Sequence, residues 1–256
     1  MEIKDSIVLV TGGNRGLGKF LVQSFLEAGA QKVYVGSRRP VELNDARLQA
    51  VNLDITDARD IAAAAEACQD VTILANNAGI MFYNSFVTPP ASSVDQARKE
   101  METNYFGTLS MVRAFAPILK KNGGGGIVNI NSFMGYFAVP AAGSYSASKA
   151  AVRALTESIR LELRSQGTFV ASVHPGVFES DMTANVIWPK IRPEYVAALT
   201  IEGILAGKEE IADPGTLKLK AMLTADPQAF WQYMQEGWDA YVPGSWKPLY
   251  QENYTG

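Results

Sequence analysis

Tyr145 and Lys149 lie four residues apart at the start of a long helical pattern, and together they could transfer a proton. Residues four apart share one face of an α-helix, so we expect the Lys149 ammonium beside the Tyr145 phenol. A free phenol has a pKa of about 10, and a neighbouring cation favours its ionised form and lowers that pKa. The pair therefore predicts a general acid or base that works near neutral pH.

Ser132 directly follows the apolar run 127–131, which is typical of a buried strand. Its hydroxyl is expected at the carboxyl end of that strand, where open α/β sheets bind their ligands. A Tyr and a Lys at this spacing are equally consistent with a surface pair. The catalytic interpretation becomes more specific when the pair is considered together with the glycine-rich segment near the N-terminus.

A glycine-rich segment separates the first predicted strand, 6–10, from a helix that extends to about residue 28. A glycine-rich turn between a strand and a helix is the context in which such a segment binds a dinucleotide. The first glycine permits a tight turn, the second lets the pyrophosphate approach the helix terminus, and the third allows close helix packing. The predicted cofactor residues here are Gly12, Asn14, Arg15, Gly16, Leu17 and Gly18.

The second predicted strand, 32–36, ends in Ser37, Arg38 and Arg39. An acidic residue near this point holds the ribose 2′-hydroxyl of NAD, whereas an arginine accommodates the 2′-phosphate of NADP. Arg15 could converge on the same phosphate. The sequence therefore favours NADP(H) over NAD(H), and the alternative is a solvated basic turn.

Strand and helix patterns alternate along most of the chain. This alternation predicts an α/β fold with a Rossmann-like, doubly wound parallel sheet in three α/β/α layers. With 256 residues and 47% hydrophobic composition, we expect one dinucleotide-binding and catalytic domain, with a core at about 5–212. The remaining C-terminal extension, about 213–256, is rich in aromatic residues. It could cover the site, pack on its own subunit or form an interface.

Charge and composition exclude several classes of protein. A net charge of −3 argues against a nucleic-acid surface, and one cysteine with one histidine leaves no disulfide and no zinc cluster. The N-terminus enters a strand without a signal-peptide pattern, and no apolar run reaches the ~18 residues of a membrane-spanning helix. We expect a cytoplasmic protein with no metal, membrane or nucleic-acid partner.

Six signals, in this order and spacing, resemble the short-chain dehydrogenase/reductase family over residues 5 to about 185. They are the glycine segment from Thr11 to Gly18, Asn76-Asn77-Ala78-Gly79, Asn104, Ser132, Tyr145-x-x-x-Lys149 and Pro175-Gly176. The resemblance implies a Rossmann fold with a Ser-Tyr-Lys site and a supporting asparagine.

Within that resemblance each catalytic residue has a role. Tyr145 exchanges a proton with the substrate oxygen, and Ser132 positions that oxygen. Lys149 binds the nicotinamide ribose and lowers the pKa of Tyr145, while Asn104 holds a water that links Lys149 to solvent. Helices 94–121 and 142–166 commonly pair across a twofold axis in the family, so a homodimer or homotetramer is implied.

The resemblance also implies cofactor contacts outside the glycine segment. Pro175 and Gly176 shape the nicotinamide pocket, the backbone of Phe178 meets the carboxamide, and Ser180 stands where the family usually has threonine. The other predicted cofactor residues are Asp54, Ile55, Asn77, Ala78 and Gly79, with Tyr145 and Lys149 themselves.

His174, the single histidine, is an inviting catalytic base. A serine hydrolase would need a G-x-S-x-G elbow, however, and the sequence contains none. We therefore interpret His174 as structural.

Apolar and aromatic residues follow the catalytic serine and the Pro-Gly turn. If these loops converge, they predict a pocket for an apolar or aromatic ketone, aldehyde or secondary alcohol. Ordinary core packing is the alternative for any one of them. The predicted pocket residues are Phe133, Met134, Phe137, Met182 and Trp188.

These observations predict an NADP(H)-dependent oxidoreductase, a carbonyl reductase or alcohol dehydrogenase in which Tyr145 is the proton donor or acceptor. One alternative is a non-catalytic NADP-binding regulator that senses redox state. Such proteins usually lose the Tyr or the Lys, and this chain retains both. Another alternative is dehydratase or epimerase chemistry on the same scaffold.

Overall fold

A seven-stranded parallel sheet forms the centre of the molecule, with strand order β3-β2-β1-β4-β5-β6-β7. The computed structural model describes residues 1–39, 42–82, 86–87, 93–184, 186 and 188–239. The predicted doubly wound parallel sheet is confirmed. The strands are β1 (Ile7–Thr11), β2 (Lys32–Ser37), β3 (Leu48–Asn52), β4 (Ile73–Asn76), β5 (Gly126–Ile130), β6 (Phe169–His174) and β7 (Glu210–Ala212).

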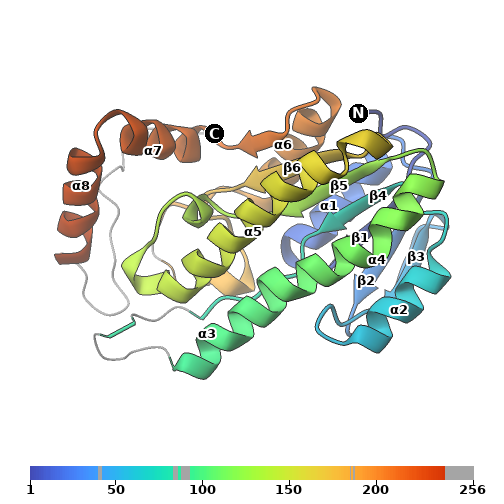
Figure 1. The fold of residues 1–256 in the computed structure, drawn as a ribbon, viewed down its shortest axis with the longest axis horizontal. Helices are drawn as coiled ribbons and strands as arrows, with labels where there is room; N and C mark the ends of the chain where they lie inside the picture. The colour runs from blue at the N-terminus through green and yellow to red at the C-terminus, as the bar shows by residue number, and fades with distance from the viewer. Residues whose placement is uncertain (40–41, 83–85, 88–92, 185, 187, 240–256) are drawn as a thin grey trace.

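Helices cover both faces of the sheet, which gives the three predicted layers (Figure 1). Helices α1 (Gly16–Glu27) and α6 (Pro193–Leu205) pack on one face. Helices α2 (Ala58–Ala67), α4 (Thr108–Lys121) and α5 (Gly143–Glu162) pack on the other. The remaining α-helices are α3 (Val94–Glu100), α7 (Pro214–Ala225) and α8 (Pro227–Asp239).

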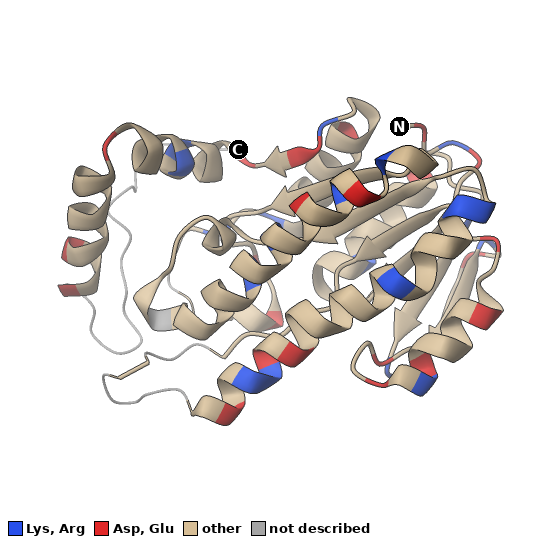
Figure 2. Ribbon diagram, viewed as in Figure 1, with Lys and Arg blue, Asp and Glu red and all other residues tan. Residues whose placement is uncertain are grey.

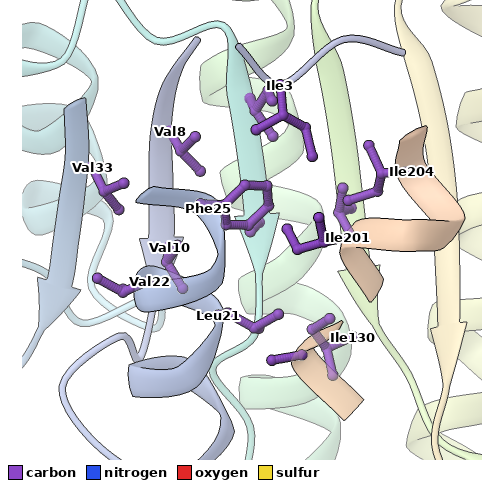
Figure 3. Packing of buried hydrophobic residues seen from close by; sticks show 14 of the residues in the cluster. Ile3, Val8, Val10, Leu21, Val22, Phe25, Val33, Ile130, Ile201 and Ile204 are labelled. Atoms are coloured by element: carbon purple, nitrogen blue, oxygen red, sulfur yellow. The ribbon is translucent and has the colours of Figure 1, made fainter. Parts of the chain in front are cut away.

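The two faces of the central strands contribute side chains to two separate apolar cores. Successive strand residues point to opposite faces, so Val8 and Val10 of β1 join one core whereas Leu9 joins the other. Figure 3 shows the first core, where Phe25 of α1 and Ile204 of α6 lie against the strands. All five of these side chains are fully buried, which fixes the strand ends that carry the site.

The chain reverses its direction of winding between β3 and β4. It leaves β3 at one edge of the sheet and returns to place β4 beside β1. Open α/β sheets bind ligands at such a switch point, outside the carboxyl ends of the strands. Here those ends are Thr11 of β1 and Asn76 of β4.

Several predicted helices differ from the observed ones. The helix predicted over 94–121 is interrupted by a π-helical segment, Met101–Gly107, which contains Asn104. After this segment, α4 contains Pro117 and continues to Lys121. The helix predicted over 142–166 ends at Glu162 and is followed by the 3₁₀ turn Arg164–Gln166. Further 3₁₀ turns are Phe133–Gly135, Pro140–Ala142 and Asp181–Thr183.

The described part of the C-terminal extension forms α7 and α8, at one end of the molecule (Figure 1). Phe230 and Met234 of α8 are buried with Phe137 and Trp188 of the same subunit. This part of the extension therefore packs on its own subunit, one of the three predicted alternatives. Tyr241, Trp246, Tyr250 and Tyr254 lie outside the described residues. Among the helices that the structure describes, none combines the length and apolarity needed to cross a bilayer.

Candidate functional site

A cleft of about 360 Å³ opens at the switch point of the sheet. A smaller cavity of about 60 Å³ shares Tyr145, Phe178 and Ser180 with it. Pro175 and Gly176 line the smaller cavity. The other predicted cofactor residues all line the large cleft: Gly12, Asn14, Arg15, Gly16, Leu17, Gly18, Ser37, Arg38, Arg39, Asp54, Ile55, Asn77, Ala78, Gly79, Tyr145, Lys149, Phe178 and Ser180.

The glycine-rich segment forms the floor of the large cleft. Gly16 begins α1 with φ +50°, and a methyl group there would meet no protein atom within 4 Å. At Gly18, in contrast, a methyl group would overlap the carbonyl oxygen of Gly12. The N-terminus of α1 is thus open toward the cleft at Gly16, while Gly18 packs tightly against the preceding loop. This arrangement leaves room for an anion at the helix N-terminus.

The loop after β4 is tied to the glycine segment by the Asn77 side chain and the Thr11 hydroxyl. Asn77 Nδ2 donates to the carbonyl oxygens of Thr11 (2.9 Å) and Gly12 (3.2 Å). Thr11 Oγ1 accepts from the backbone N–H groups of Asn77 (2.9 Å) and Ala78 (3.0 Å). These bonds make one wall of the cleft from two segments far apart in sequence.

Three arginines give the cleft positive charge. Arg38 and Arg39 are exposed at the end of β2, and the Ser37 hydroxyl donates to the Arg39 carbonyl oxygen at 2.6 Å. Arg15 forms an ion pair with Asp181 at 2.8 Å, and both side chains are largely exposed. Since Asp181 follows β6, this ion pair joins two walls of the cleft.

Tyr145 and Ser132 meet where the two cavities join. Ser132 caps the 3₁₀ turn after β5, with its Oγ accepting from the Met134 N–H at 3.2 Å. Tyr145 stands in the first turn of α5 and forms a hydrogen bond with Ser132. Both side chains line the smaller cavity, so both hydroxyls are available to one oxygen atom of a ligand there.

Lys149 lies one helical turn beyond Tyr145, as its spacing predicted. Its Nζ is 5.6 Å from the centroid of the Tyr145 ring and donates to the Ile130 carbonyl oxygen at 2.9 Å. Lys149 is 5% exposed, and burial lowers its pKa to about 8. A buried ammonium that donates one hydrogen bond, to the Ile130 carbonyl oxygen, has further donors to offer a ligand in the cleft.

The sequence-based prediction of a lowered Tyr145 pKa is wrong for this structure. Burial raises that pKa above its ordinary value, the hydrogen bond with Ser132 lowers it, and the charge of Glu100 raises it. The spacing placed Lys149 correctly, but it could not show that the phenol is buried. Tyr145 is therefore protonated at neutral pH.

Asn104 braces the loop after β4 against α5. Its Oδ1 accepts from the Ile80 N–H at 2.9 Å, and its Nδ2 donates to the Ile80 carbonyl and to Ser148 Oγ, both at 2.9 Å. It is 1% exposed and lies in the π-helical segment, a feature often found at functional sites. Its water-holding role stays a prediction.

The smaller cavity has an apolar lining on the side away from the large cleft. Four predicted pocket residues line it: Phe133, Met134, Met182 and Trp188. Phe137, the fifth predicted pocket residue, does not line this cavity; its ring packs against Phe230 of α8, with centroids 4.8 Å apart. The C-terminal helix that covers Phe137 had no recognisable link to this loop in the sequence.

Several polar residues of the site were not predicted from the sequence, among them Asn131, Asp181 and Glu100. Asn131 lines both cavities and accepts from the Ser132 N–H at 3.0 Å; its place directly before Ser132 could have indicated it. Nothing in the sequence around Asp181 indicated its ion pair with Arg15. Charged residues of both signs alternate along α3 (Figure 2), and only the burial of Glu100 distinguishes it from them.

Glu100 is fully buried, and its Oε1 accepts from the Phe82 N–H at 2.6 Å. Burial raises its pKa, while the hydrogen bond from the Phe82 N–H lowers it. Glu100 thus ties α3 to the loop after β4.

The family model for short chain dehydrogenase matches residues 6–189. Among solved structures, a short chain dehydrogenase from Burkholderia cenocepacia J2315 in complex with NADP superposes with a TM-score of 0.87. It is 38% identical, and the match covers 91% of this chain and 99% of that one.

Two relatives match at similar identity but different coverage. The 2,5-dichloro-2,5-cyclohexadiene-1,4-diol dehydrogenase LinX of Sphingobium indicum is 33% identical, over 96% of this chain and 97% of its own length. A dehydrogenase/reductase SDR family protein 7-like of Drosophila melanogaster is 30% identical over 73% of this chain, and the match spans 61% of the fly protein.

Proposed function

The chain belongs to the short-chain dehydrogenase/reductase family, and on that premise we propose that it interconverts a ketone or aldehyde and the corresponding alcohol with NADP(H). One observation carries the proposal. Tyr145 lines both the large cleft and the apolar cavity, so the proton-transfer group stands where cofactor and substrate meet. Ser132 lines the apolar cavity with it, and Lys149 lines the large cleft with it.

The residues of the large cleft fit a dinucleotide. The open methyl position at Gly16 leaves room for a pyrophosphate at the N-terminus of α1. Arg15, Arg38 and Arg39 are the groups that would hold a 2′-phosphate, and β2 ends in Ser37 instead of an acidic residue. The related Burkholderia enzyme, in complex with NADP, supports the choice of NADP over NAD.

Bound NADPH supplies a hydride to the carbonyl carbon. The Ser132 and Tyr145 hydroxyls hold the carbonyl oxygen, and Tyr145 donates its proton to that oxygen as negative charge develops there. Because the pKa of Tyr145 is raised, the phenol carries this proton at neutral pH. Lys149 places a positive charge near the tyrosinate left behind. The free enzyme therefore has Tyr145 in the protonation state that reduction requires.

The substrate we propose is apolar and carries its carbonyl on or beside a ring. The cavity lining beyond Ser132 and Tyr145 is dominated by Phe133, Met134 and Trp188, and no charged side chain lines it among the described residues. An apolar cavity with a few convergent polar groups binds an apolar ligand in one orientation. The related cyclohexadienediol dehydrogenase, whose name describes a cyclic diol substrate, supports a cyclic compound.

We also propose that residues 1–256 act as one domain and that the protein forms a homodimer or homotetramer. Phe106, in the π-helical segment, is 47% exposed and Leu161 of α5 is 69% exposed. These apolar side chains lie on the helices that we expect to pair. Size-exclusion chromatography with light scattering tests this: a monomer at micromolar concentration would contradict it.

The direct test of function is consumption of NADPH and of NADH, followed by ultraviolet absorbance, with cyclohexanone, acetophenone, benzaldehyde and 4-carboxybenzaldehyde. We expect NADPH oxidation with the three apolar carbonyls and little with the charged one. Tight NADPH binding without oxidation by any of them would favour a redox-sensing regulator instead.

A further inference from the structure

His174 is a buried residue that the proposed reaction does not use, yet it contacts the proposed catalytic serine. It ends β6 and is 1% exposed. Its Nδ1 lies 3.1 Å from the main-chain carbonyl oxygen of Ser132. A carbonyl oxygen only accepts hydrogen bonds, so Nδ1 must carry the proton of this bond.

Apart from the hydrogen bond with Tyr145, the other bonds to Ser132 come from its own turn or from the residue before it. Gly135 N–H donates to the same carbonyl oxygen at 2.9 Å, Met134 N–H donates to Oγ, and Ser132 N–H donates to Asn131. These bonds shape the turn internally. The imidazole of His174 reaches it from a neighbouring strand and so helps to set its position on the sheet.

The imidazole is itself held in place by the Tyr136 ring. The two rings are stacked, with centroids 4.2 Å apart and planes at 20°. The Lys220 ammonium lies 4.5 Å from the centroid of the Tyr136 ring. Glu210 of β7 forms an ion pair with Lys220 of α7. The contacts thus run from the C-terminal segment to Ser132.

We propose that His174 is a positioning residue for catalysis, which orients Ser132 through its main-chain carbonyl and is itself held by Tyr136 and the Glu210–Lys220 pair. This inference rests on the proposed function, in which Ser132 holds the substrate oxygen. A shift of about 1 Å in such a group can cost about 100-fold in rate. Loss of the His174 contact should therefore lower the rate by a measurable factor.

His174 is neutral in this environment. Burial lowers its pKa to about 4, the bond to Ser132 and the charge of Glu210 raise it, and Lys220 and Arg153 lower it. A neutral imidazole has one protonated nitrogen, and the bond to Ser132 requires that nitrogen to be Nδ1.

Because His174 is the only histidine, nitrogen-15 NMR of the imidazole reports on it without ambiguity. In the full-length protein we expect the Nδ1–H tautomer and no titration between about pH 5 and pH 8. The Nε2–H tautomer, or a titration near the ordinary value of about 6.5, would overturn the proposal.

A double-mutant cycle then separates positioning from simple stability. His174→Asn retains an amide donor near the position of Nδ1, whereas His174→Gln places its donor nearer that of Nε2. With the panel carbonyl of highest kcat/KM, we expect His174→Gln to lower kcat about 10- to 100-fold and His174→Asn to restore most of it. NADPH affinity, measured by its fluorescence, should stay within about two-fold.

In a Ser132→Ala background, His174→Gln should have little further effect, because the two residues act as one unit. The same fold-loss in both backgrounds would overturn the proposal. Full activity of Ser132→Ala would instead contradict the role of Ser132 in the proposed function. Should His174→Gln not fold, the cycle is run with Tyr136→Leu, which removes the stacked ring and leaves the imidazole; equal losses in both backgrounds would again overturn the proposal.

Discussion

Replacement of Arg38 by alanine should weaken NADPH binding while leaving NADH binding almost unchanged. Arg38 lines the cleft directly after β2, and β2 ends in Ser37 and not in the acidic residue that would favour NAD. A charge-assisted hydrogen bond to a phosphate contributes about 1.5 to 3 kcal/mol. The expected loss of NADPH affinity is therefore about 10- to 100-fold.

The loss of NADPH affinity should lie near the lower end of this range. Arg38 is exposed, so solvent and salt screen its charge, and the loss should shrink as ionic strength rises. Arg15 could compensate in part, although it must first leave Asp181, an exposed ion pair that costs at most about 1 kcal/mol to break.

The assay is a fluorescence titration of NADPH and of NADH into wild type, Arg38→Ala and the control Arg98→Ala. Arg98 is an exposed arginine of α3 that does not line the cleft, so its removal makes the same charge change elsewhere. Equal losses for both cofactors, or the same loss in the control, would refute the assignment of Arg38 to the 2′-phosphate.

Three further outcomes follow from buried parts of the site. Gly18→Ala should abolish cofactor binding and lower the melting temperature, because the new methyl group would overlap the Gly12 carbonyl oxygen; wild-type affinity would contradict this. The kcat/KM for reduction should fall above about pH 8, where Lys149 loses the proton that makes it an ammonium, and a profile flat to pH 9 would count against it. Phe230→Ala should cost about 3 to 5 kcal/mol of unfolding free energy in urea, because this fully buried ring packs on Phe137; a cost below about 1 kcal/mol would place the ring outside the core.

The sheet and the cofactor cleft could be predicted because their signals are local in sequence. The strands are short apolar runs, and the glycine segment from Gly12 to Gly18 stands between a strand and a helix as its spacing requires. Once the strands are parallel, their carboxyl ends lie at one edge, which brings Ser132 and Tyr145 together.

Features that depend on tertiary burial could not be predicted. The helical pattern around Asn104 is continuous in sequence, and the π-helical segment there is visible only in the structure. Glu100 resembles any charged helix residue until the loop at Phe82 covers it. The pKa of Tyr145 depends on desolvation, which spacing from Lys149 does not report.

The contacts of the C-terminal helices with the site could not be predicted from the sequence either. Phe137 follows Ser132 closely in sequence, yet it packs against Phe230, almost a hundred positions later. Lys220 of α7 likewise reaches Tyr136 in the turn after β5. These contacts join segments that share no motif, so only the folded chain shows that the extension supports the site.

The most direct test of the central claim is the turnover of Tyr145→Phe with NADPH and the best panel carbonyl. The variant loses only the exchangeable proton and its bond to Ser132, so NADPH affinity should stay within about two-fold while turnover falls at least about 100-fold. Tyr195→Phe, a change at a partly exposed tyrosine of α6, is the matched control and should keep full activity. Wild-type turnover in Tyr145→Phe would remove Tyr145 from the mechanism and contradict the account.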